Sequence, residues 1–255
     1  MGRAVAEAAA RPAHVRVECG RFWAEELAME LARPELVLVH PGQLGRTVAL
    51  RIAELLQAAV KQRGVATLAL SGGPQTPWVY RDLRELALPW EKIEFWFTDE
   101  RCVPERHPAS NWYAAADLLF SDIRIRAEGA FRIEAERPDH EEVAREYEER
   151  LPERFDVALL ELGLDGHLAG LFPNSPALRE RERRVVAVET AAKPHHRITV
   201  TPPVLESSGE LLVLATGRDR APALRAALAG ELGDALPARC ALRGTWFVDA
   251  GSRAA

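Results

Sequence analysis

The chain has 255 residues, 47% of them hydrophobic, which is enough to bury a substantial core, and no linker-like or repetitive stretch interrupts it. The net charge is −5 with both signs interspersed, and no basic stripe carries interleaved aromatic residues, which argues against a nucleic-acid partner. No apolar run is long enough to cross a membrane, and the N-terminus lacks the apolar core of a signal peptide. We therefore expect a single domain over residues 1–255, with residues 1–13 frayed.

The cysteines are odd in number, lie far apart and lack the CxxC spacing of a metal or redox site: they are Cys19, Cys102 and Cys240. Reduced thiols in a cytoplasmic protein fit this usage best, and we expect a monomer or a small homo-oligomer. Arginine carries almost all of the positive charge. The three lysines, Lys61, Lys92 and Lys193, are therefore worth considering one by one, although chance alone can retain a lysine.

The first half of the chain alternates apolar runs with segments of helical periodicity. Residues 36–39 predict a buried strand, and a helix follows Pro41 and ends at Gly64. Its inward face is predicted to carry Val48, Ile52, Leu55 and Ala59. A second strand is predicted over residues 66–70 and a third over residues 93–97. The helix between them starts at Pro77 and turns Val79, Leu83 and Leu86 inward.

The second half continues the pattern. Ser110 or Asn111 can cap a helix that runs to Phe120. Asp139 and Glu142 have the spacing of a capping box at the start of the next helix, whose inward residues are Val143, Tyr147 and Leu151. A central strand is predicted within residues 155–162, and a late helix near residues 221–228. Further strands are predicted at residues 185–188, 197–200, 211–215 and 245–248.

Apolar strands separated by amphipathic helices favour an α/β fold with a mostly parallel sheet covered on both faces. In such sheets, ligands bind outside the carboxyl ends of the strands. Polar residues at the strand ends are therefore the first candidates for function.

The stretch SGGPQTP follows the second strand. Glycines at Gly72 and Gly73 let the backbone approach a ligand, and Thr76 before Pro77 is a favoured helix start. Free N–H groups at a helix N-terminus attract an anion. No nucleotide-binding P-loop or GxGxxG pattern is present. A capped turn without a ligand is the alternative.

Asp99, Glu100 and Arg101 follow the third strand. The guanidinium of Arg101 offers two parallel donors that suit a phosphate or a carboxylate. The alternative is an ordinary ion pair at the surface.

Asp165, Gly166 and His167 follow the central strand. A carboxylate orients an imidazole, and imidazole suits proton transfer near neutral pH. A structural histidine in a turn is the alternative. We favour function, because a polar turn between the apolar residues Leu168 and Leu171-Phe172 would be costly to keep without a use.

Lys193 precedes Pro194, which biases its backbone toward an extended conformation leading into the strand at Arg197. His195 and His196 have no third ligand at metal spacing, so we interpret them as surface residues. The GxSxG and SxxK patterns of serine nucleophiles and the HExxH pattern of zinc enzymes are also missing. The residues together suggest an anion-binding turn, two cations and a positioned base.

Four ordered motifs resemble the 6-phosphogluconolactonase family, from about residue 36 to residue 248: they are SGGPQTP, WFTDERCVP followed by Ser110-Asn111, GLDGHLAGLFP and KPHHRIT. The resemblance implies a Rossmann-like three-layer α/β sandwich. It also implies hydrolysis of 6-phospho-D-glucono-1,5-lactone, a small sugar phosphate lactone, without a metal or another cofactor.

The same resemblance implies roles for particular residues. His167 would be the base that activates water, with Asp165 beside it. The substrate and its phosphate would be bound by Ser71, Gly72, Gly73, Thr76, Asp99, Arg101, Lys193 and Arg197. Three departures from the family pattern stand out. One extra residue lies in the SGGPQTP turn, Glu161 replaces a frequent glycine, and Gly170 replaces a frequent serine.

Two other functions remain as alternatives. Glucosamine-6-phosphate deaminases share the fold and a D-G-H motif, but they typically have D-E-Y where this chain has Asp99-Glu100-Arg101. A non-catalytic sugar-phosphate sensor would need the anion site but not His167.

Overall fold

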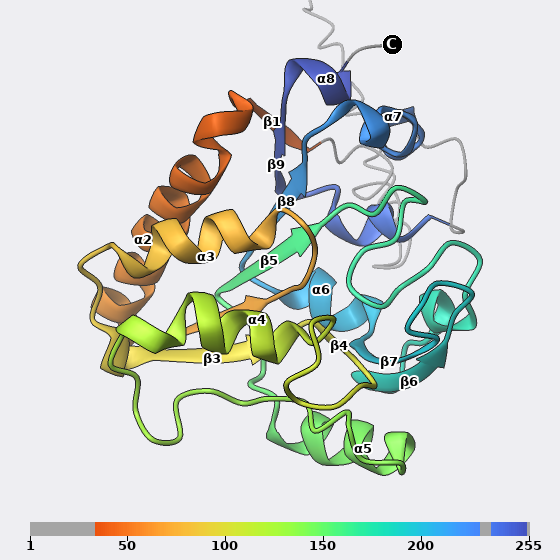
Figure 1. Ribbon diagram of the computed structural model, residues 1–255, viewed down its shortest axis with the longest axis horizontal. Coiled ribbons are helices and arrows are strands. Elements are labelled where there is room, and N and C mark those ends of the chain that lie inside the picture. Colours follow the sequence, from red (N-terminus) through yellow and green to blue (C-terminus); the bar gives the residue numbers. More distant parts are fainter. Residues whose placement is uncertain (1–33, 230–235, 254–255) are drawn as a thin grey trace, which may run out of the picture. The chain divides into compact units, whose positions relative to one another are not determined.

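Helices and strands alternate along most of the chain in the computed structural model, which describes residues 34–229 and 236–253 (Figure 1). Six strands form the main sheet: β1 (Glu35–Leu38), β2 (Ala66–Leu70), β3 (Ile93–Phe97), β5 (Val157–Glu161), β8 (Glu210–Ala215) and β9 (Thr245–Val248). All their pairings are parallel. The prediction of a mostly parallel α/β sheet is thereby confirmed.

The strand order of the sheet is β1-β9-β8-β5-β2-β3, so strands are added in opposite directions from its centre. From β2 the chain moves outward to β3, whereas from β5 it moves the opposite way through β8 to β9. The direction of winding therefore reverses between β2 and β5, and such a switch point is where open α/β sheets bind ligands. Every residue of β2 and β5 is buried, so their two following turns emerge side by side from the centre of the core.

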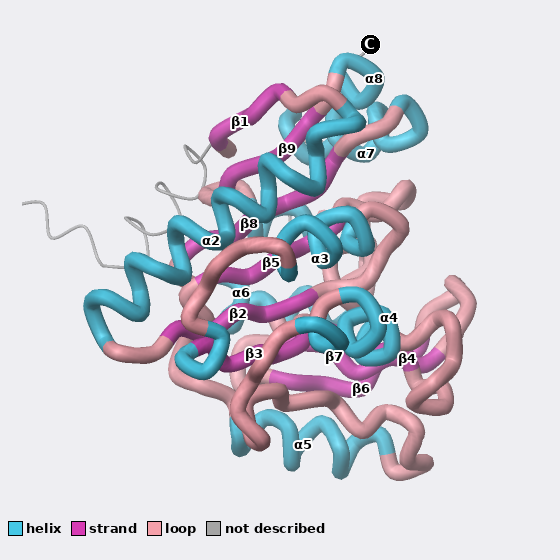
Figure 2. The backbone as a smooth tube through the Cα atoms, turned by 60° about the vertical axis from the view of Figure 1, so that its left-hand side comes forward, coloured by secondary structure: helices cyan, strands magenta, loops and turns pink. Residues whose placement is uncertain are grey.

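The helices cover both faces of this sheet. Figure 2 shows α2 (Leu44–Arg63) and α3 (Thr76–Arg84) over one face, and α6 (Pro202–Ser207) on the other. The remaining helices are α4 (Asn111–Leu118), α5 (His140–Arg150), α7 (Ala221–Ala229) and α8 (Ala250–Arg253). Helix α2 ends at Gly64 as predicted, but Leu56 rather than Leu55 completes its fully buried face. Helices α6 and α8, of six and four residues, are too short to show a helical period and were not predicted.

A second, antiparallel sheet contains β4 (Asp99–Arg101), β7 (His196–Val200) and β6 (Val185–Glu189), in that order. Two predicted strands therefore lie outside the main sheet. Strand β4 was not predicted, because its three residues are all charged and carry no apolar pattern. The pairing sets Arg101 opposite Arg197.

The helix starts differ in part from expectation. The Ser110 side chain caps α4 by accepting from the N–H of Tyr113. Asp139 precedes α5 but makes no capping hydrogen bond, since its carboxylate is paired with Arg137. Thr76 is the first residue of α3, and Gln75 holds the capping position.

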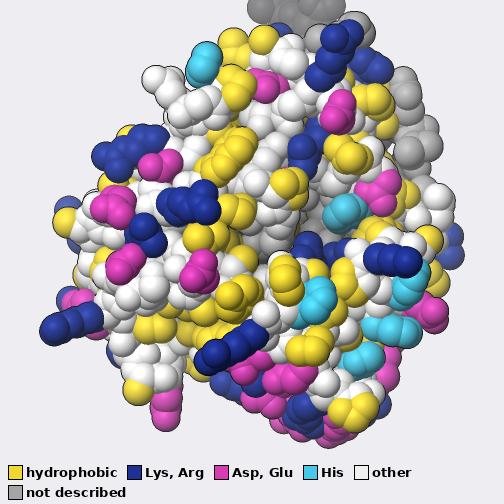
Figure 3. Space-filling model, viewed as in Figure 1, with side chains coloured by type: hydrophobic (Ala, Val, Ile, Leu, Met, Phe, Trp, Pro, Cys, Tyr) yellow, Lys and Arg dark blue, Asp and Glu magenta, His cyan; other side chains and the backbone are white. Residues whose placement is uncertain are grey.

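The residues that the structure describes group into one unit by their internal contacts. The predictions of a single domain over 1–255, of frayed residues 1–13 and of a reduced Cys19 concern residues outside the described part. On the face drawn in Figure 3, side chains of both charge signs are interspersed. Between residues 34 and 253, leaving out 230–235, no helix has the length and apolarity needed to cross a membrane.

Candidate functional site

The Ser71 turn, residues 71–76, joins β2 to α3 and is held from below by Tyr80. The buried Tyr80 hydroxyl donates to the Ser71 carbonyl at 2.5 Å, and the Thr76 hydroxyl donates to the Gly73 carbonyl at 3.1 Å. A Cβ on Gly72 would stand 1.8 Å from Asn111 Oδ1 and 3.1 Å from an Arg101 nitrogen. Only glycine fits there, and the turn lies directly against the residues that follow β3.

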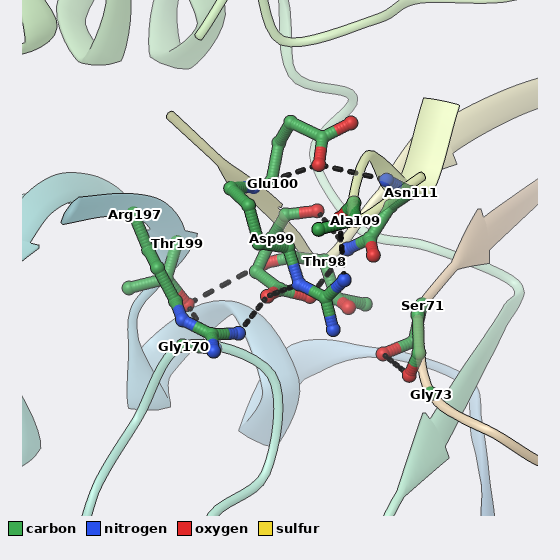
Figure 4. A network of polar contacts seen from close by, with 12 residues as sticks. Ser71, Gly73, Thr98, Asp99, Glu100, Ala109, Asn111, Gly170, Arg197 and Thr199 are labelled. Atoms are coloured by element: carbon green, nitrogen blue, oxygen red, sulfur yellow. Dashed lines mark hydrogen bonds and ion pairs between the residues drawn. The ribbon is translucent and has the colours of Figure 1, made fainter. Parts of the chain in front are cut away.

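Three residues after β3 and on β7 form the arginine cluster: Asp99, Arg101 and Arg197. The Asp99 carboxylate lies 3.6 Å from Arg197 Nη1 and 3.9 Å from Arg101 Nε. Figure 4 shows Asp99 between Arg197 and Asn111. Asp99 and Arg197 are only 2% and 5% exposed, so this is no surface ion pair. Burial lowers the pKa of Arg197, and the Asp99 charge opposes that shift.

Among the described residues, several polar atoms of the arginine cluster and of the neighbouring Asn111 are without a hydrogen-bond partner. The cluster holds two guanidinium groups around the one carboxylate of Asp99. The Nε atoms of Arg101 and Arg197 and the Oδ1 atom of Asn111 are buried and without a hydrogen-bond partner. Buried polar groups are rarely left unpaired. The two guanidinium groups suit an anionic ligand, whereas the Asn111 oxygen can only accept a hydrogen bond.

Glu100 explains the middle residue of the Asp-Glu-Arg triplet. Its buried carboxylate accepts hydrogen bonds from the N–H groups of Arg101, Asn111 and Trp112 at 2.7–2.8 Å, and from the Ser110 hydroxyl at 3.0 Å. Burial raises the pKa of Glu100. Glu100 thus ties β4 to the start of α4 and fixes the backbone of Arg101, a role that the sequence did not reveal.

The His167 loop, residues 163–172, follows β5. His167 Nδ1 lies 2.5 Å from Asp165 Oδ1, and the same oxygen accepts from the His167 N–H at 3.1 Å. The hydrogen bond from His167 lowers the pKa of Asp165. A Cβ on Gly163 would stand 2.1 Å from the His167 ring, so the imidazole packs on the backbone at the end of the strand.

Phe172 joins the His167 loop to the arginine cluster. Its ring stacks on His167 with centroids 4.7 Å apart, and the Arg197 guanidinium carbon lies 5.3 Å from the same ring. The imidazole and the guanidinium therefore pack against one aromatic ring. The sequence marked Phe172 only as an apolar flank, since nothing in the pattern predicts the stacking.

Glu161 occupies the other end of the Ser71 turn. This last residue of β5 is 5% exposed, and its carboxylate accepts from the Gln75 N–H at 2.9 Å. Its second oxygen is ion-paired with Arg220. The sequence identified Glu161 as a departure from the family pattern, but Arg220 was not among the predicted site residues.

Lys193 is exposed in the connection between β6 and β7, four residues before Arg197. Within the described residues it makes no ion pair or hydrogen bond. His195 and His196 are exposed as predicted. His195 Nδ1 lies 3.0 Å from the Thr190 carbonyl, and the His196 ring lies 5.6 Å from that of His140. Across the part of the chain that the structure describes, no three His, Cys, Asp or Glu side chains gather as metal ligands would.

Comparison with known proteins agrees with these motifs. A family described as glucosamine-6-phosphate isomerases/6-phosphogluconolactonase matches residues 40–248. A 6-phosphogluconolactonase of Streptomyces coelicolor is 32% identical over 243 residues, covering 86% of this chain and 93% of that protein. The crystal structure of a 6-phosphogluconolactonase from Thermotoga maritima matches with a TM-score of 0.77 at 25% identity, covering 85% of this chain and all of that one.

A monomeric glucosamine-6-phosphate deaminase has nearly the same backbone, with a TM-score of 0.76 at 21% identity over 86% of this chain and 98% of that one. The fold alone therefore does not separate the two activities. The family match spans most of the chain, including every predicted site residue. The chain belongs to the glucosamine-6-phosphate isomerase/6-phosphogluconolactonase family.

Proposed function

We propose that the chain hydrolyses 6-phospho-D-glucono-1,5-lactone to 6-phospho-D-gluconate in the oxidative pentose phosphate pathway. The observation that carries the proposal is the pair of His167 and Asp165 at the end of β5, joined through Phe172 to the buried Arg197. One side of this arrangement suits proton transfer and the other suits an anion. A phosphorylated sugar ring requires both.

His167 would act as the general base. When Nδ1 donates to Asp165, Nε2 is left to accept a proton from water. The activated water attacks the lactone carbonyl carbon. The bond from that carbon to the ring oxygen then breaks, and the ring oxygen takes the proton back as a hydroxyl. A lactone is an activated ester, so one imidazole is a sufficient catalyst, and no metal is needed for this sequence of steps.

The carbonyl oxygen becomes an oxyanion when water attacks, and this charge requires a hydrogen-bond donor or a cation. The N–H groups of Gly166, His167 and Gly170 already bind the Gly163 carbonyl, the Asp165 carboxylate and the Thr199 hydroxyl. These internal hydrogen bonds leave a cation as the better candidate.

The phosphate would be bound on the side of Arg101 and Arg197, whose guanidinium groups lie together around Asp99. Asp99 would hold the two arginines in place. Ser71 and Gly72 would contact the ligand beside Arg101. Lys193 would close over the phosphate from the β6–β7 connection. Gly73 and Thr76 lie at the opposite end of the turn, beside Glu161.

The test is purified protein with freshly made 6-phosphogluconolactone, compared with glucosamine 6-phosphate. We expect acid release from the lactone above the enzyme-free rate, because the lactone also opens spontaneously. Ammonia release from glucosamine 6-phosphate instead would assign the deaminase activity. Binding of the sugar phosphate without turnover of either compound would assign the sensor function.

A further inference from the structure

Glu161, at the end of β5, lies against the Gly73–Thr76 part of the Ser71 turn, where the sequence predicts that a ligand's phosphate binds. Its carboxylate oxygen accepts from the Gln75 N–H at 2.9 Å, and the backbone of Thr76 is a second partner. A Cβ on Gly73 would stand 2.3 Å from the same oxygen. The carboxylate therefore rests on the backbone of the turn and binds the first N–H groups of α3, a helix of nine residues.

Arg220 completes this arrangement. One guanidinium nitrogen pairs with Glu161, Nε donates to the Leu162 carbonyl at 2.7 Å, and Nη1 donates to the Thr216 carbonyl at 3.3 Å. The side chains of Arg220 and Glu161 are 12% and 4% exposed. Burial raises the pKa of Glu161, and the Arg220 charge is the first of the interactions that oppose this shift. The pair is neutral, and each partner is surrounded by hydrogen bonds.

The arginine cluster differs in both respects. Its two guanidinium groups face the single carboxylate of Asp99, and two buried Nε atoms are without a hydrogen-bond partner in the described structure. The neighbouring Glu100 carboxylate is bound instead by backbone N–H groups and the Ser110 hydroxyl. A dianion that approached the Gly73 end of the turn would meet the Glu161 charge, whereas at the Gly72 end it would meet Arg101. In a site shielded from water, such a difference in charge decides where an anion binds.

We propose that Glu161 is a specificity-determining residue that fills the anion site at the start of α3 and neutralises Arg220. A substrate's phosphate is consequently held by the arginine cluster and excluded from the Gly73–Thr76 end of the turn. The inference rests on the proposed function only in that the ligand is a sugar phosphate. It departs from the sequence-based prediction that Gly73 and Thr76 contact the phosphate.

The test is calorimetric titration with inorganic phosphate, which requires no turnover. Glu161→Gly opens the turn and frees Arg220, so we expect its dissociation constant for phosphate to fall at least tenfold below that of wild type. The double variant E161Q/R220Q keeps hydrogen-bonding groups but removes both charges. Its dissociation constant should stay within twofold of wild type. Glu206→Gln is the control for loss of a carboxylate elsewhere: Glu206 lies on α6 and is paired with Arg181, which precedes β6.

Two results would overturn the proposal. One is a Glu161→Gly variant that binds phosphate no more tightly than wild type. The other is a tenfold weaker affinity in E161Q/R220Q, which would mean that phosphate displaces Glu161 and binds Arg220. Thermal unfolding shows whether each variant is folded, and Glu161→Gln, expected to bind phosphate more tightly than wild type, replaces the glycine variant if that one is not. A wild type inactive on the lactone would reject the proposed function and leave this comparison of affinities standing.

Discussion

The His167 loop and the arginine cluster both contact the ring of Phe172 but are built differently. The loop holds its imidazole by local contacts, all from residues within five positions of His167: Asp165, Gly163 and Phe172. The arginine cluster depends on residues about a hundred positions apart, paired across β4 and β7. The proposed reaction steps are thus assigned to the His167 loop, which local sequence determines, and phosphate binding to the arginine cluster, which depends on strand pairing. Variants of the loop should therefore lower kcat, and variants of the cluster should raise KM.

The largest effect is expected for His167→Ala. Turnover should fall by about 100-fold or more, the usual contribution of a general base, while the affinity for inorganic phosphate stays near that of wild type. Steady-state kinetics corrected for spontaneous opening measures the first quantity and calorimetry the second. His195→Ala removes an exposed imidazole from the β6–β7 connection and serves as the control. Ordinary turnover in His167→Ala would exclude His167 from the reaction.

Asp165→Asn should give the next largest effect. The amide cannot accept a charge-assisted hydrogen bond from Nδ1, so the imidazole loses both its preferred tautomer and its orientation. We expect kcat to fall by roughly 10- to 100-fold with little change in KM. A change confined to KM would place Asp165 on the binding side of the comparison.

Arg101→Gln should affect substrate binding more than turnover. Loss of a charge-assisted contact to phosphate is expected to raise KM about tenfold, while kcat changes less. Arg51→Gln on α2, at a half-buried arginine paired with Glu54, controls for the loss of one positive charge. If kcat fell as far as in Asp165→Asn with KM unchanged, the division between chemistry and binding would be wrong.

Lys193→Ala should be milder. The ammonium is exposed and makes no ion pair in the described structure, and such contacts contribute on the order of 1 kcal/mol or less. KM should therefore rise by a factor of about 2 to 5 with turnover unchanged. Lys92→Ala is the matched control, and an unaltered KM in Lys193→Ala would remove this residue from the phosphate site.

The smallest effect concerns stability in acid. The pKa of Asp165 is lowered by His167. A carboxyl with a lowered pKa stabilises the fold above its unfolded value, and this contribution is lost as pH falls through the folded value. Because Asp165 is half exposed, the contribution should be well under about 1 kcal/mol. Below about pH 4, the free energy of unfolding from urea titrations should decline less steeply in Asp165→Asn than in wild type. Equal slopes would contradict the expectation.

The sequence predicted what local pattern determines. All six strands of the main sheet and the helices α2, α3, α4, α5 and α7 follow from apolar periodicity and their flanking residues. The position of His167 beside Asp165 follows from a spacing of two residues. The ion pair of Glu161 and Arg220 spans 59 positions, and the pairing that sets Arg101 opposite Arg197 spans nearly a hundred. Contacts of this kind depend on strand order, which periodicity does not encode.

The Tyr80 hydroxyl beneath the Ser71 turn also gives the protein an optical reporter. Burial raises the pKa of Tyr80 far above its ordinary value, because a phenolate charge at this site would lose its solvation by water. In alkaline solution, the near-ultraviolet absorbance of this phenol should change only when α3 separates from the turn. The other two tyrosines, the equally buried Tyr147 and the exposed Tyr113, can be replaced by phenylalanine. The absorbance change would then time the opening of this corner of the molecule.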